Sequence, residues 1–66
     1  MEQTMGQKIR DRRKHLGMSQ EDLARKSNLS RARISAIENG HCKDILVSTL
    51  TTISTALGTT VEFFLT

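Results

Sequence analysis

The sequence predicts an all-α domain of four helices, followed by a short C-terminal segment that is either a fifth helix or a strand. Two observations indicate helices: the 66 residues contain no proline, and serine or threonine precedes several of the expected helices. A third is that Gly17, Gly40 and Gly58 stand where helices would end. We expect a single domain over residues 1–66, and at this length its core is marginal.

The first two helices are expected over residues 5–16 and 20–27, because each follows a capping signature. Thr4 is followed three residues later by Gln7, and Ser19 by Asp22. In this spacing the two side chains can each bond a backbone N–H at the start of the helix.

The third and fourth helices are predicted from caps and apolar spacing. Asn28 suits a left-handed turn after the second helix, and Ser30 is expected to cap a third helix that ends before Gly40. Residues 41–47 show no helical period and are interpreted as a loop. Ser48 would cap the fourth helix, which carries its apolar stripe at Leu50, Ile53 and Leu57.

Basic residues are concentrated in the first half of the chain. Residues 1–33 contain nine of the ten lysines and arginines and have a local charge of +5, whereas residues 34–66 have −2. Such asymmetry is typical of a surface that binds a polyanion such as DNA. From composition alone, solvated helix faces in a small charged protein are an equally good interpretation.

The run QEDLARKSNLSRARISAIENG, which begins at Gln20, has the pattern of a helix-turn-helix. Ala24 is small where the two helices would cross, and Leu29 would fill the angle between them. This run, with LGMSQEDLA and the ALG before the last segment, resembles the DNA-binding domain of the lambda and Cro repressors and of the xenobiotic-response-element family of bacterial regulators. Ser27 and Asn28 depart from the family, which generally has an apolar residue and a glycine there.

The resemblance covers most of the chain. It implies a compact repressor-type helix-turn-helix domain with the motif at residues 20–39. The expected function is that of a transcriptional regulator, and a repressor is favoured over an activator. The partner would be double-stranded DNA.

The outward side of the third helix would carry small residues. If Ile34 and Ile37 face the core, a rotation of about 100° per residue points Ala32 away from it. Such a helix can enter the major groove, while Arg31 in its first turn suits guanine. By resemblance the base readers are Arg31, Ala32 and Ala36, to which the outward position adds Ser35.

The resemblance assigns phosphate contacts to Gln20, at the start of the second helix, and to Asn39, at the end of the third. Either could also be an ordinary solvated helix-end residue. It also implies an ion pair between Arg13 and Glu38 with a structural role, although the basic run around Arg13 is commonly just solvated. The further phosphate candidates are Arg33, Lys43 and Arg10.

Enzyme, metal and RNA functions have little support in the sequence. His41 and Cys42 are adjacent, but two ligands in one loop fall short of a tetrahedral zinc site, and His15 is distant. Tryptophan and tyrosine are absent, so the stacking platforms of single-strand binders are missing. We expect no enzyme activity, metal or cofactor, and a cytoplasmic protein without a membrane segment.

An antitoxin is the alternative function, since many antitoxins resemble this domain and also bind DNA. Its main partner would be a toxin protein. A dedicated antitoxin often has extra chain to wrap its toxin, and little is left over here, which favours a simple regulator.

A homodimer is expected, because one domain reads few base pairs and a pseudo-palindromic site needs two recognition helices. The C-terminal segment 59–66 and the outer side of the fourth helix are predicted to hold the dimer together. Val61, Phe63 and Leu65 fit one face of a strand, whereas Val61, Phe64 and Leu65 fit a helical turn. The β-branched and aromatic residues favour a strand that pairs across the dimer axis.

Overall fold

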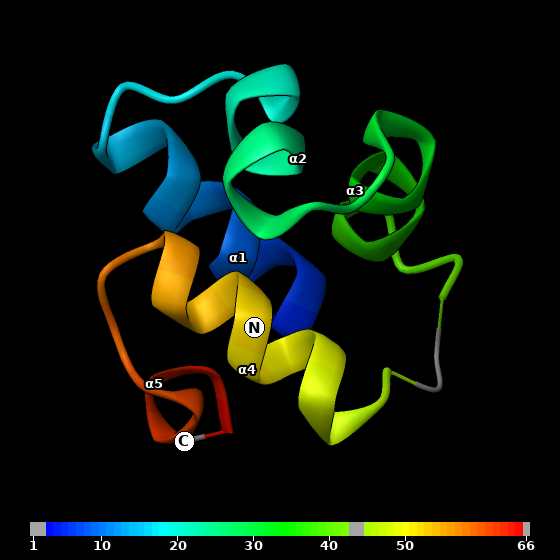
Figure 1. The fold of residues 1–66 in the computed structure, drawn as a ribbon. Helices are drawn as coiled ribbons and strands as arrows, with labels where there is room; N and C mark the ends of the chain where they lie inside the picture. Colours follow the sequence, from blue (N-terminus) through cyan, green and yellow to red (C-terminus); the bar gives the residue numbers. More distant parts are fainter. Residues whose placement is uncertain (1–2, 43–44, 66) are drawn as a thin grey trace.

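The computed structural model describes residues 3–42 and 45–65, and the regular structure in these ranges is entirely helical. In chain order the helices are α1 (Met5–His15), α2 (Gln20–Ser27), α3 (Arg31–Glu38), α4 (Val47–Ala56) and α5 (Val61–Leu65). Helix α1 packs on α3 and α5, α2 packs on α3 and α4, and α4 also contacts α5 (Figure 1). None of the described helices is long and apolar enough to cross a membrane. The all-α prediction is therefore confirmed, with five helices.

The predicted caps of the first three helices are present. The Thr4 hydroxyl accepts from the Gln7 backbone N–H at 3.2 Å, and the Gln7 side chain accepts in return from the Thr4 N–H at 3.0 Å. Ser19 and Asp22 make the same reciprocal pair. The Ser30 hydroxyl accepts from the N–H of a residue one turn into α3. These bonds satisfy backbone donors that have no partner inside a helix.

Helix α4 begins earlier than predicted. Its N-cap is Leu46, which makes no side-chain cap bond, and Ser48 lies within the helix instead of before it. Ile45 packs against the core, so the entry to α4 is set by burial of an apolar residue. The Thr51 hydroxyl bonds back to the Val47 carbonyl at 2.8 Å, a bond available inside a helix.

The predicted C-terminal strand is wrong, because residues 61–65 form α5. A strand at an edge would leave a row of backbone groups unpaired, whereas a helical turn bonds its own. The turn also places Phe64 in the core with 2% of its surface exposed. Phe63, the neighbouring residue, lies outside the core with 48% of its surface exposed.

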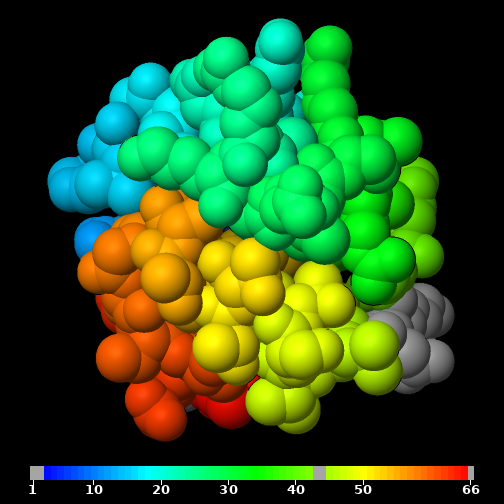
Figure 2. Space-filling model, in the orientation of Figure 1, coloured from blue at the N-terminus to red at the C-terminus, as the bar shows by residue number. Residues whose placement is uncertain are grey.

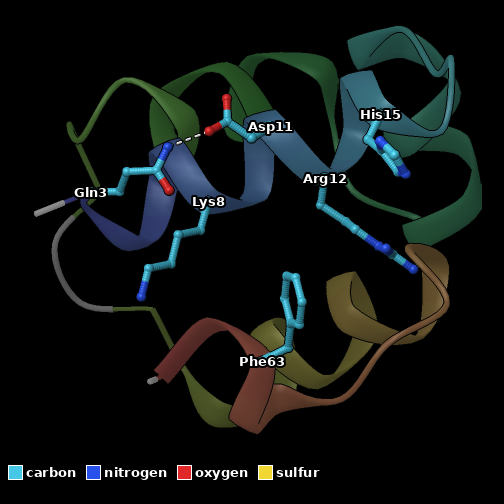
Figure 3. A pocket seen from close by; sticks show the side chains of 6 residues that line it. All are labelled: Gln3, Lys8, Asp11, Arg12, His15 and Phe63. Atoms are coloured by element: carbon cyan, nitrogen blue, oxygen red, sulfur yellow. Dashed lines mark hydrogen bonds between the residues drawn. The ribbon is translucent and has the colours of Figure 1, made fainter.

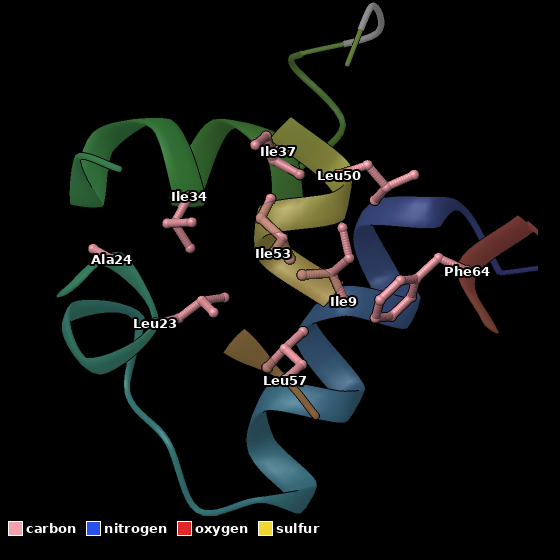
Figure 4. Packing of buried hydrophobic residues seen from close by; sticks show 9 residues of the cluster. All are labelled: Ile9, Leu23, Ala24, Ile34, Ile37, Leu50, Ile53, Leu57 and Phe64. Carbon is pink, nitrogen blue, oxygen red and sulfur yellow. The ribbon is translucent and has the colours of Figure 1, made fainter. Parts of the chain in front are cut away.

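The core lies where all five helices meet (Figure 4). Each helix contributes at least one buried apolar side chain, and α1 and α5 contribute one each. The cluster consists of Ile9, Leu23, Ala24, Ile34, Ile37, Leu50, Ile53, Leu57 and Phe64.

Gly6 allows α1 to lie directly against the end of α3. A Cβ atom at this position would stand 2.2 Å from the carbonyl oxygen of Ile37, which is too close for any side chain. The interior glycine in α1 is therefore explained by a close helix–helix approach.

Candidate nucleic-acid interface

Helices α2 and α3 meet at a tight corner. Asn28 ends α2 in the left-handed conformation, with φ of 59° and ψ of 33°. Leu29 packs against the core, and Ala24 is buried in it. The Ser27 hydroxyl donates to the Leu23 carbonyl at 2.7 Å, so a serine here leaves no unpaired group in the interior. The two helices form the upper part of the face seen in Figure 2.

The outward side of α3 has short side chains, as predicted. Ala32 is exposed, while Ser35 and Ala36 are half-buried. Arg31 and Arg33 are exposed in the first turn of the helix. The surface between these arginines and the end of the helix therefore has no bulky side chain, and a nucleic acid could approach the helix closely.

Arg13 and Glu38 form the predicted ion pair in the interior. Arg13 Nε lies 2.7 Å from Glu38 Oε2, and Arg13 Nη2 donates to Oε1 at 3.0 Å. The remaining Nη1 donates to the Met18 carbonyl at 2.7 Å. One guanidinium thus joins α1, the segment before α2 and the last turn of α3. Two parallel bonds of this kind define a fixed geometry.

Gln20 is joined to the same pair. Its Nε2 donates to Glu38 Oε1 at 3.2 Å, and the side chain is half-buried. This bond could not be predicted from the sequence, because the two residues are 18 positions apart and on different helices. The only available signal was the helix-turn-helix register, which brings the start of α2 near the end of α3.

Asn39 is exposed at the C-cap of α3, and its Nδ2 donates to the Ser35 hydroxyl at 3.3 Å. Arg10 is exposed on α1, away from this corner in sequence. Lys43 lies outside the described residues.

Arg12 lies on the side of α1 that faces α5. A groove of about 460 Å³ lies there, between α1 and Phe63 (Figure 3). Its guanidinium carbon lies 5.6 Å from the centroid of the Phe63 ring, and its Nε donates to the Leu57 carbonyl at 3.2 Å. The basic run of α1 is therefore not simply solvated. Arg12 joins the end of α4 to α5, and Arg13 forms the buried pair.

A family model described as helix-turn-helix matches residues 9–64. The chain belongs to this helix-turn-helix family. A comparison with curated proteins gave no match. Together with the solved structures described next, the family match confirms the predicted resemblance to repressors and bacterial regulators.

Solved structures of regulators share the fold of this helix-turn-helix chain. SinR, described as the master regulator for biofilm formation and solved in complex with DNA, is 28% identical with a TM-score of 0.91, over 96% of this chain and 100% of SinR. The DNA-binding domain of the P22 c2 repressor is 32% identical with a TM-score of 0.89, over 98% and 86%. The restriction-modification controller protein C.AhdI from Aeromonas hydrophila is 30% identical with a TM-score of 0.86, over 91% and 89%.

Proposed function

We propose that this helix-turn-helix protein regulates transcription, as a repressor, by binding double-stranded DNA sequence-specifically with α3 in the major groove. The observation that carries the proposal is the outward side of α3, where Arg31 stands in the first turn beside the small side chains of Ala32, Ser35 and Ala36. A groove about 12 Å wide admits such a helix. Similarity to SinR, solved with DNA, and to the P22 c2 repressor supports it.

In this arrangement the residues divide into two groups. Arg31 reads guanine, and the small residues of α3 contact base edges such as a thymine methyl group. Phosphates are bound on either side of the motif, and these contacts position the helix without reading sequence. The phosphate-binding residues are Gln20, Asn39, Arg33 and Arg10, together with Lys43.

Site selection from a pool of random duplexes tests the proposal, followed by affinity measurements on the selected site. Arg31→Ala should weaken binding to that site by about 1–3 kcal/mol and relax the preference at one base pair of each half-site. Lys14→Ala, an exposed basic residue of α1, controls for the loss of one positive charge. Failure to select any sequence would refute specific binding, and equal weakening on all duplexes would make Arg31 a phosphate contact.

The protein also acts as a homodimer on a pseudo-palindromic site. Phe64 is in the core and so is excluded from the interface predicted for it, but Leu65 remains 61% exposed. Of the other residues predicted for the interface, Val61 packs partly against the core, and Phe63 lies over α1. Leu46 and Val47 are 64% and 75% exposed at the start of α4. The start of α4 and the last turn of α5 both lie along the lower edge of the face seen in Figure 2.

Sedimentation equilibrium with point variants tests the dimer, because a truncation before α5 would also remove Phe64 from the core. Leu65→Glu should dissociate the dimer, since a charge would be buried in an apolar contact. Leu16→Glu is the matched control, as Leu16 is exposed at the end of α1. A wild-type monomer at micromolar concentration, or a Leu65→Glu dimer, would refute the interface.

The antitoxin alternative has no specific support among the similar structures and stays a prediction. A gene for a toxin beside this one, and co-purification of its product with the protein, would favour it over a stand-alone regulator.

A further inference from the structure

The carboxylate of Glu38 is at the centre of a network that reaches the proposed DNA surface. It is only 4% exposed, and both of its oxygens are used. Oε2 accepts from Arg13 Nε, while Oε1 accepts from both Arg13 Nη2 and Gln20 Nε2. Gln20 is the first residue of α2, and Glu38 is adjacent to Asn39, so the network joins both proposed phosphate-binding ends of the motif.

The charge of Glu38 determines which way the Gln20 amide faces. An ionised carboxylate can only accept hydrogen bonds, so the amide must present its NH₂ group to it. One N–H of that group is then used, and the second remains for another acceptor. The backbone N–H of Gln20 is in the first turn of α2, where backbone donors lack helical partners. The second side-chain N–H and the backbone N–H of Gln20 are therefore two donors available to one phosphate.

We propose that Glu38 is a positioning residue for DNA binding: it fixes the Gln20 amide with its N–H toward the phosphate. The inference rests on the proposed function. Arg13 also contributes to DNA binding in this proposal, because it neutralises the Glu38 carboxylate, which is hydrogen-bonded to the phosphate-binding amide of Gln20. Without Arg13, the negative charge of Glu38 would repel the DNA backbone.

A double-mutant cycle on DNA affinity separates positioning from a purely structural role. Gln20→Ala should weaken binding about tenfold, and Glu38→Gln by a similar factor, since a neutral amide no longer holds the Gln20 side chain in one orientation. If Glu38 acts through Gln20, Glu38→Gln should have little further effect in the Gln20→Ala background. Urea unfolding of each variant ensures that affinities are compared between folded proteins.

Arg25→Ala is the matched control, because Arg25 forms an exposed ion pair with Asp22 on the same helix. Its effect on affinity should multiply with that of Gln20→Ala. Should Glu38→Gln fail to fold, Glu38→Asp keeps the charge but withdraws the carboxylate by one methylene group, and enters the same cycle.

The outcomes distinguish this inference from the function on which it rests. A Glu38 effect of equal size in both backgrounds would make the residue structural only. Unchanged affinity in Gln20→Ala would overturn the phosphate contact and the positioning together, while specific binding through Arg31 would stand. Absence of DNA binding by the wild-type protein would refute the proposed function itself.

Discussion

Helices α1, α2 and α3 each begin after a side chain that caps the helix, whereas α4 begins at Val47, after Leu46, which makes no side-chain cap bond. The predicted starts of the first three helices agree with the structure, and the prediction for the last two elements does not. A cap is a bond between near neighbours, so its pattern is visible in the sequence. The position of α4 and α5 depends on burial of Ile45 and Phe64 by distant residues, which local spacing does not reveal.

Removal of the Phe64 side chain should reduce stability more than any of the other substitutions below. Phe64→Ala should lower the free energy of unfolding by about 3–5 kcal/mol, because it empties a core site. Phe63→Ala, on the same helix but half-exposed, should cost less than half as much, mainly through loss of the contact with Arg12. Urea unfolding measures both.

Similar losses in the two phenylalanine variants would contradict α5 as described. If Phe64→Ala does not fold at all, Phe64→Leu retains most of the buried volume and should show an intermediate loss.

Removal of a serine hydroxyl should lower the free energy of unfolding by less than removal of Phe64. The loss should be larger at the start of α3, where the hydroxyl is a cap, than in α4. Ser30→Ala removes the hydroxyl that caps α3 and should cost about 1 kcal/mol. Ser48→Ala lies inside α4, makes no cap and should change stability by less than about 0.5 kcal/mol. Thermal unfolding of both variants measures these losses. If Ser48→Ala lost as much stability as Ser30→Ala, Ser48 would be the cap of α4 after all.

The smallest effect concerns the cap of α2 in acid. The Ser19 backbone N–H and hydroxyl, and then Arg25, lower the pKa of Asp22 below its ordinary value. A carboxyl with a lowered folded-state pKa stabilises the protein fully above its unfolded pKa of about 3.9, and loses that contribution as pH falls through the folded value. Wild type should therefore exceed Asp22→Asn in stability at pH 6, and the difference should shrink below about pH 4.

Unfolding midpoints across this pH range test the prediction. Glu21→Gln, in the same exposed turn, controls for the loss of one negative charge. A difference between wild type and Asp22→Asn that stays constant down to pH 2 would contradict it.

The sequence was sufficient for the fold class and for much of the candidate site. Asn28 and the capping residues act locally, and Ile34 and Ile37 determine which side of α3 faces outward. The pair between Arg13 and Glu38 came from family resemblance, since spacing alone does not connect two helices.

The other features depend on tertiary packing and could not be predicted from the sequence. The strand predicted for residues 61–65 followed β propensity, which burial of Phe64 overrides. The bond from Gln20 to Glu38 and the stacking of Arg12 on Phe63 both join residues from separate helices. Tertiary packing alone places such residues together.

Helix α3 is packed more tightly at its last turn than at its first, which Ser30 caps. Its last turn lies under Gly6, holds the buried Glu38, and is followed by a bond from the His41 N–H to the Ala36 carbonyl at 2.8 Å. Its first turn, with Arg31, is exposed. Thermal fluctuation should therefore increase toward the first turn, with faster amide hydrogen exchange there. In the complex that we propose, Arg31 would approach the bases from the less buried end of α3, and Asn39 would approach the phosphates from the more tightly packed end.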